Sequence, residues 1–186
     1  MDASADLKMA EEIAVSSKCG RPGVCNAIEN LVVESSIAGE FLPQVAKQLT
    51  EKGCELIVDE TAGNILKDFP TRSASEEDFA EEFLDLRLSI KVVDSLEDAI
   101  SFVNTYGSGH SESIITSNKK RAETFLNAVD ASSVYWNAST RFTDGFEFGL
   151  GAEIGISTDR LHARGPMGLE ELCTYKYQIT GNGQWK

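Results

Sequence analysis

LVVESSIAGEFLPQVAKQLTEKGCELIV, residues 31–58, is the stretch that decides the fold. Its hydrophobic pattern predicts a strand at Leu31–Glu34, a helix from Ile37 to Lys52 that ends before Gly53, and a second strand at Glu55–Val58. Strand, helix and strand in this order and at this spacing are typical of a βαβ unit, whose two strands run parallel.

The same alternation continues on both sides of this stretch. We expect helices at Asp6–Ser17, Glu60–Leu66, Ser95–Asn104 (capped by Ser95) and Asn118–Val129, strands at Leu86–Val93, Ser113–Thr116 and Ser133–Asn137, and a loop at Lys67–Asp78. The sequence therefore predicts the α/β class, as a three-layer α/β/α arrangement with a mainly parallel sheet. Ligands of such sheets bind at the carboxyl ends of the strands, so the loops after Val93 and Trp136 are expected to carry the site.

Two regions near the carboxyl end break the alternation. Asn137–Gly145 and Glu147–Gly155 form a long, Gly-rich polar region, and long loops in a compact domain are usually functional. Cys173–Thr180 is predicted to be a terminal strand that pairs with an edge of this chain or of a partner subunit. We therefore divide the chain into an α/β domain, residues 1–170, which the resemblance given below implies is catalytic, and a terminal strand, residues 171–186, expected to serve oligomerisation or edge pairing.

Composition excludes several classes of function. The chain has 186 residues, enough for one domain, and a formal net charge of −13, which disfavours binding to nucleic acid or to an anionic membrane. Its four cysteines form neither a CxxC pair nor a zinc pattern, so we expect no metal site and a reduced, cytoplasmic protein. No apolar run approaches the ~20 residues of a membrane span, and the acidic amino terminus is unlike a signal peptide.

Cys25 is the candidate nucleophile. It follows the turn-forming run Gly20-Arg21-Pro22-Gly23, and we expect it to begin a short helical segment. Free backbone N–H groups and the helix dipole at such a position lower the pKa of a thiol, and Arg21 adds a positive charge. The alternative is that Cys25 is a small buried hydrophobic residue, as most free cysteines are.

Polar loops near the carboxyl end contain candidates for anion binding. Arginine, amide, hydroxyl and imidazole groups hold phosphate or carboxylate oxygens, and these loops bring together Asn137, Ser139, Thr140, Arg141, Thr143, His162 and Arg164. Either arginine can instead be a solvated surface residue, and His162 can be structural. We expect His110, at a turn before a strand, to be structural. The sequence contains no dinucleotide fingerprint and no P-loop.

Several blocks of the sequence resemble one enzyme family. Arg21–Ala27, Glu82–Leu86, Tyr106–Glu112, Asn137–Gly145, Glu147–Thr158 and His162–Glu171 are similar to the carboxyl-terminal, catalytic part of the γ-glutamyl phosphate reductases (glutamate-5-semialdehyde dehydrogenases). That family belongs to the aldehyde dehydrogenase superfamily. The similarity runs from about Asp2 to the end of the chain.

The resemblance implies a reaction and its participants. It implies that Cys25 attacks the acyl phosphate of L-glutamyl 5-phosphate, that NADPH reduces the resulting thioester to L-glutamate 5-semialdehyde, and that Glu82 binds the nicotinamide ribose. This is the second step of proline biosynthesis. Arg21, Arg141 and the Asn137–Thr143 loop are then expected to bind the substrate. The implied partners are a second copy of the chain and a glutamate 5-kinase that hands over the substrate.

The sequence also departs from the family that it resembles. Members are about twice as long, and the amino-terminal half that they add carries most of the nucleotide-binding domain. We therefore assign the first helix to that half and expect the isolated chain to be inactive. Cys19-Gly20 replaces a Thr-Gln pair, Trp136 a small β-branched residue and Phe146 a glycine. Two alternatives stay open: the reductase domain of a bifunctional pyrroline-5-carboxylate synthase, and an inactive module that only dimerises.

Overall fold

A parallel sheet forms from the strands that the hydrophobic pattern predicted. The computed structural model describes all 186 residues, and its main sheet has the order β1-β4-β2-β3, with every neighbouring pair parallel. The strands are β1 (Asn30–Glu34), β2 (Glu55–Val58), β3 (Thr71–Ser73) and β4 (Arg87–Val93). Leu31 lies opposite Ile90 in the register of β1 and β4.

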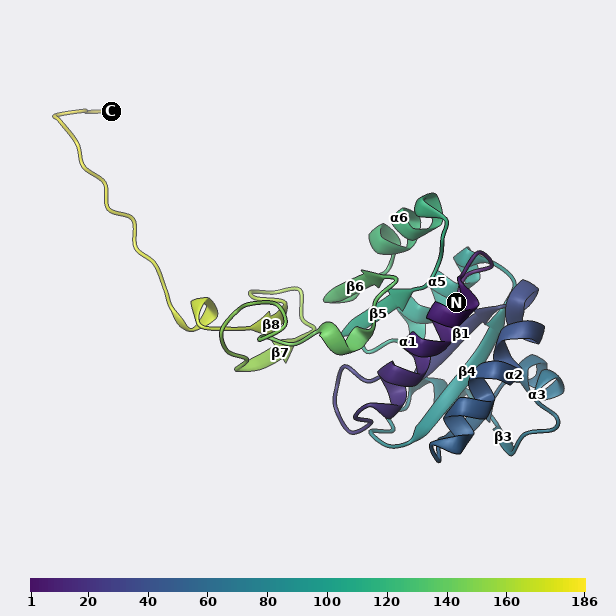
Figure 1. Ribbon diagram of the computed structural model, residues 1–186. Coiled ribbons are helices and arrows are strands. Elements are labelled where there is room, and N and C mark those ends of the chain that lie inside the picture. Colours follow the sequence, from purple (N-terminus) through teal and green to yellow (C-terminus); the bar gives the residue numbers. More distant parts are fainter.

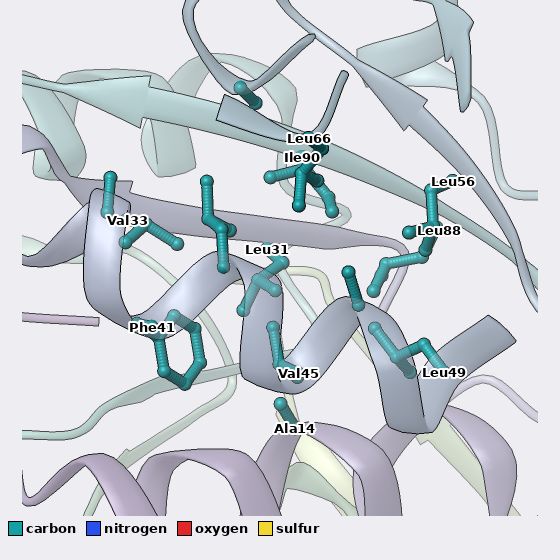
Figure 2. Packing of buried hydrophobic residues seen from close by; sticks show 14 of the residues in the cluster. Ala14, Leu31, Val33, Phe41, Val45, Leu49, Leu56, Leu66, Leu88 and Ile90 are labelled. Atoms are coloured by element: carbon teal, nitrogen blue, oxygen red, sulfur yellow. The ribbon is translucent and has the colours of Figure 1, made fainter. Parts of the chain in front are cut away.

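Two long helices cover one face of this sheet. The helix α2 (Ser35–Glu51) packs against the sheet, and α1 (Leu7–Cys19) packs against α2. Figure 2 shows Val45 of α2 between Leu31 of β1 and Ala14 of α1, three residues that are almost fully buried. Each buried side chain of the size of Val or Leu contributes about 1.5–3 kcal/mol of transfer free energy, so this layer supplies most of the core.

The opposite face of the sheet carries two further helices. Ser89 of β4 points away from α2 and donates to the carbonyl of Asp78, 3.2 Å away, within α4 (Glu76–Ala80). Phe79 of α4 packs edge-on against Phe102 of α5 (Leu96–Tyr106), with ring centroids 5.3 Å apart. A short helix, α3 (Glu60–Ile65), follows β2. Helices thus lie on both faces, as expected for a three-layer α/β/α arrangement.

A second, smaller parallel sheet continues the main one across a gap. It consists of β5 (Ser111–Ile114) and β6 (Ser133–Trp136), which α6 (Lys119–Ala128) connects. Met1 bridges to β1, because its amine donates to the carbonyl of Val32 (2.6 Å) and its carbonyl accepts from Glu34 N (3.0 Å). The N–H of Asp2 donates to the carbonyl of Ile115, just after β5, 3.1 Å away. The first two residues of the chain therefore link the two sheets.

Two segments differ from the predicted secondary structure. Lys67–Asp78 is not all loop, because it contains the edge strand β3 and the start of α4, which begins in a capping box between Ser75 and Asp78. Cys173–Thr180 pairs with no edge of this chain and extends into solvent, and the other expectation, pairing with an edge of a partner subunit, stays a prediction. The rest of the carboxyl end holds only short elements: η1 (Thr140–Phe142), β7 (Gly155–Ser157), β8 (Gly165–Met167) and η2 (Glu170–Leu172).

The antiparallel pair of β7 and β8 forms an arm that projects from the body, and the tail continues from it (Figure 1). Many exposed large apolar side chains of the molecule belong to this arm and tail, including Leu161, Tyr175, Tyr177 and Ile179. None of the helices combines the length and the hydropathy that a membrane crossing requires.

Candidate active site

An ion pair closes the base of the loop that carries Cys25. Lys18, near the end of α1, is fully buried, and its Nζ lies 2.6 Å from Glu29 Oε2, just before β1. The N–H of Ile28 donates to the carbonyl of Ser17 beside this pair, 3.2 Å away. The loop between these residues is therefore fixed at both ends, although its tip is a series of turns.

The local setting of Cys25 differs from the sequence prediction. The helix α1 ends at Cys19 before Gly20, as the turn-forming run predicts, but no helix begins at Cys25. The thiol is exposed, and its pKa is raised, chiefly by partial desolvation and also by the carboxylates of Glu82 and Glu153. Arg141 and the backbone of Cys25 act in the opposite direction. The expected activation by a helix dipole is thus wrong, and the positive charge that favours the thiolate comes from Arg141 rather than from Arg21.

The loop after β6 folds back onto the residue next to Cys25. The side-chain amide of Asn26 donates to the carbonyl of Thr143 (2.9 Å) and to that of Arg141 (3.4 Å). In return, the hydroxyl of Thr140 donates to the carbonyl of Asn26 (2.7 Å). The predicted nucleophile and the predicted substrate loop, more than a hundred residues apart, are therefore locked together.

The short polar side chains of this loop hold it in place within the chain. Ser139 contacts Ser17 of α1 through their hydroxyls (2.6 Å), and Thr143 is buried against Ser111 and Tyr135. Asn137 has a positive φ of 55°, and its amide bonds to both backbone groups of Thr116. The sequence predicted that these side chains bind substrate, whereas their polar atoms are already used by the protein.

Cys25 and Glu82 open into one cavity of about 230 Å³. The cavity lies between the two sheets, and Thr140, Ser111, Glu29 and Met1 are also among its lining residues. The carboxylate of Glu82 is exposed and has no hydrogen bond or ion pair within the chain. The predicted nucleophile, Cys25, and the predicted cofactor ligand, Glu82, therefore line one cavity, and the carboxylate of Glu82 is free to accept hydrogen bonds.

The cationic candidates fall into two groups. Arg141 lies near Cys25 with no carboxylate partner, and Arg21 is exposed on the Cys25 loop, also without one. Arg164 instead bonds to Asp130 (2.9 Å) and lines a second, polar pocket of about 410 Å³, which shares Gly107 and Glu112 with the first cavity. His162 is exposed, with a φ of 63°, on the arm between β7 and β8, and lines neither cavity. Arg141 is thus the cationic candidate whose charge lowers the pKa of the nucleophile, whereas neither His162 nor Arg164 lines the cavity of Cys25.

The site lies at the amino ends of the strands, which corrects the expected location. Cys25 precedes β1, Glu82 precedes β4, and Ser111 is the first residue of β5. Glu29 joins the first two loops, since its Oε1 accepts from the N–H of Leu84, 3.1 Å away. The loop after β6 reaches this edge only because it turns back from Asn137 to Thr143, and the loop after Val93 does not take part.

Several residues of the site escaped the sequence analysis. Lys18, Glu29 and Glu153 were not singled out, because no local pattern marks charges that meet only after folding. His110 was expected to be structural, and it is buried in a hydrogen-bonded group with Ser111. No group of three or more His, Cys, Asp or Glu side chains is arranged to hold a metal ion.

Comparisons with known proteins agree with the fold. The model of the aldehyde dehydrogenase family matches residues 81–176, more than half of the chain. The chain belongs to the aldehyde dehydrogenase family.

Particular relatives within the family are reductases. A γ-glutamyl phosphate reductase of Clostridium botulinum is 54% identical over 184 residues, which cover 99% of this chain and 44% of the relative. The crystal structure of γ-glutamyl phosphate reductase from Thermotoga maritima matches with a TM-score of 0.95 and 49% identity, over 98% of this chain and 44% of that one. The corresponding yeast structure, from Saccharomyces cerevisiae, matches with a TM-score of 0.61 and 32% identity, over 80% and 37%. The chain therefore spans less than half of the length of these relatives.

Proposed function

We propose that this chain is the nucleophile-bearing part of a γ-glutamyl phosphate reductase, which converts L-glutamyl 5-phosphate to L-glutamate 5-semialdehyde and phosphate. The observation that carries the proposal is the shared cavity: Cys25, whose thiol is exposed, and Glu82, whose carboxylate is free, line the same space, and the charge of Arg141 lowers the pKa of the thiol. The relatives that cover 99% of the chain carry this activity in their names.

Cys25 performs the first chemical step. Its sulfur attacks the acyl carbon, the bond from that carbon to the phosphate oxygen breaks, and phosphate leaves with the electron pair and takes up the thiol proton. A thioester on Cys25 results. The free guanidinium of Arg141 suits the anionic substrate, and its charge favours the thiolate form of Cys25.

Glu82 fits a nicotinamide cofactor, because its unpaired carboxylate can accept hydrogen bonds from ribose hydroxyls inside the cavity. NADPH, when bound, supplies the hydride that reduces the thioester to the aldehyde. The bond between the acyl carbon and sulfur then breaks, and the sulfur of Cys25 leaves as the thiolate for the next cycle. The loop held by Asn26 keeps the thiol in place throughout.

The arm and tail supply the proposed contact with a second copy of the chain. Tyr177 is 81% exposed and Ile179 91% exposed, and a stable fold rarely leaves such side chains in water without a partner. Residues 171–186 are thus the oligomerisation segment, and residues 1–170 the catalytic domain.

The substrate is reactive, so a glutamate 5-kinase is the partner that supplies it, and the cytoplasm is the compartment of both.

A chimera tests the proposed activity. The part of the C. botulinum relative that aligns with this chain is replaced by the chain, and turnover is measured in the reverse direction, from L-glutamate 5-semialdehyde, phosphate and NADP⁺ to NADPH. We expect phosphate-dependent formation of NADPH by the chimera and none by its Cys25→Ser variant.

Cys173→Ser is the matched control, because this thiol is also exposed but lies in the tail. It should keep the turnover of the chimera. Turnover that survives Cys25→Ser contradicts the covalent mechanism, and a folded chimera that binds NADP⁺ but forms no NADPH contradicts the assignment of the reaction.

A further inference from the structure

His110 begins a continuous series of hydrogen bonds that leads toward Cys25. The imidazole is only 6% exposed, and its Nδ1 lies 2.7 Å from the hydroxyl of Ser111. That hydroxyl lies 2.5 Å from Thr143 Oγ1, which in turn lies 2.7 Å from the hydroxyl of Tyr135. Four side chains from three segments of the chain thus share one partly buried network.

The network ends on the residue next to the nucleophile. The carbonyl of Thr143 accepts from the side-chain amide of Asn26, 2.9 Å away, and Asn26 is itself buried. A shift of Thr143 therefore moves the hydrogen-bond acceptor that fixes the backbone at Cys25. The hydroxyls of Ser111 and Tyr135 are the side-chain groups that hold Thr143 Oγ1.

Hydrogen bonds to the start of β6 fix the backbone of His110. The carbonyl of His110 accepts from the hydroxyl of Ser132 (2.5 Å) and from the N–H of Ser133 (3.0 Å), so its backbone is tied to the start of β6. Its Nε2 is buried and has no partner within the chain. Burial lowers the pKa of His110, whereas Glu82 and Glu153 raise it less, so the ring is neutral near pH 7. A neutral ring that uses only Nδ1 is suited to orient a neighbouring hydroxyl.

We propose that His110 is a positioning residue for Cys25, acting through Ser111 and Thr143 on Asn26. The proposal rests on the proposed role of Cys25 as the nucleophile. The alternative is that His110 only fills space. The two differ in one respect: positioning requires a polar atom at Nδ1, and packing requires only the volume of the ring.

Two substitutions separate these roles. His110→Asn retains a polar atom near the place of Nδ1 with less volume, and His110→Phe retains the ring without a polar atom. Ser111→Ala removes only the hydroxyl that connects His110 to Thr143, and it replaces His110→Phe in the test if that variant does not fold. Tyr106→Phe is the control, because its hydroxyl bonds to Glu76 and to no member of the network.

The rate of carboxamidomethylation of Cys25 by iodoacetamide is measured against pH in the 186-residue chain, with each thiol followed by peptide mass spectrometry. When Cys25 is released from its partly desolvated setting, its pKa returns toward the ordinary value and its rate at pH 8 rises. We expect a rise of about threefold or more in His110→Phe and Ser111→Ala, and wild-type rates in His110→Asn and Tyr106→Phe.

Wild-type rates in both His110→Phe and Ser111→Ala overturn the proposal, as do equal rises in His110→Asn and His110→Phe. A change in the free energy of unfolding without a change in the Cys25 rate also overturns it, because that result shows packing alone. The assay needs neither substrate nor NADPH, so its failure is distinct from failure of the chimera to turn over.

Discussion

Lys18 Nζ lies 2.6 Å from Glu29 Oε2 across the base of the loop that carries the nucleophile. The lysine is fully buried, and the glutamate also accepts from the N–H of Leu84 near Glu82. One ion pair therefore joins the end of α1, the start of β1 and the loop of the proposed cofactor ligand. Its loss affects both stability and the relative position of Cys25 and Glu82.

Glu29→Gln should destabilise the chain strongly, because it leaves the ammonium of Lys18 buried without a counter-charge. Such a loss costs about 3–5 kcal/mol. Chemical denaturation of Glu29→Gln, Lys18→Met and the double variant forms a cycle that measures the coupling. The double variant should be more stable than Glu29→Gln alone. Additive losses would show that the two side chains do not interact.

Glu112→Gln should stabilise the chain at pH 8. Burial raises the pKa of Glu112 from 4.5 to about 8, and its carboxyl group lies against Gly107 with no cation beside it. The folded chain therefore holds the proton of Glu112 more tightly than the unfolded chain does. As a result, the stability of wild type falls as the pH rises from 4.5 to about 8. We expect the advantage of the variant over wild type to grow from near zero at pH 4.5 to on the order of 4 kcal/mol at pH 8. A constant difference across this range would contradict the prediction.

Acetylation of the α-amine of Met1 should have the opposite pH dependence. Burial lowers the pKa of this amine from 8.0 to about 6, so the unfolded chain binds more protons between these values and the stability of the chain rises with pH there. The acetylated chain keeps the N–H that donates to Val32 and loses the charge. We expect it to be more stable than the free amine at pH 6, by about 2 kcal/mol, and equal to it above pH 8. A difference that does not change between pH 6 and pH 8 would contradict this expectation.

The charges around Cys25 should set the rate at which it is alkylated. Glu153 raises the pKa of the thiol and Arg141 lowers it, so Glu153→Gln should accelerate alkylation at pH 8 and Arg141→Gln should slow it. The glutamine side chain would still accept from the N–H of Gly145, because its amide oxygen can replace the carboxylate oxygen in that bond. Each change is expected to be about twofold to fivefold at low salt and smaller at about 0.5 M salt. Changes of the same sign in both variants would contradict an electrostatic origin.

Cys54 provides the internal reference for this measurement. Burial raises its pKa to about 12, so it should remain unmodified while Cys25 reacts. Alkylation of Cys54 at the rate of Cys25 would show that the chain had unfolded during the assay.

The sequence was informative where burial follows a short repeat. The strands at Leu31 and Leu56 and the helix α2 were predicted to within about two residues, because the strands are short apolar runs that become buried and the buried side chains of the helix recur at helical spacing. The strand β3 was missed for the converse reason: Thr71, Arg72 and Ser73 are all exposed at a sheet edge, and their pairing leaves no hydrophobic signal. The predicted terminal strand has a strand-like sequence but no edge of this chain beside it.

The sequence predicted some residues of the site correctly and others not. Residue type and the preceding turn identified Cys25, the family resemblance supplied Glu82, and the two residues line one cavity. Residue type also selected Ser139 and Thr143, but whether a hydroxyl faces a ligand or the protein depends on contacts between segments that lie far apart in the sequence. The direction of the pKa shift of Cys25 was wrong because the turn after Gly23 does not continue into a helix.

The link between the two sheets has a practical consequence for experiments on this chain. The amine of Met1 lies between β1 and β5 beside the main cavity, whereas Lys186 ends a tail that points into solvent. In the isolated 186-residue chain, a charged tag or a bulky fluorophore on this amine therefore starts at the seam of the sheets, next to the site that it is meant to report, whereas the chimera continues the chain there through an ordinary peptide bond. Labels for purification, immobilisation or fluorescence belong at the carboxyl end.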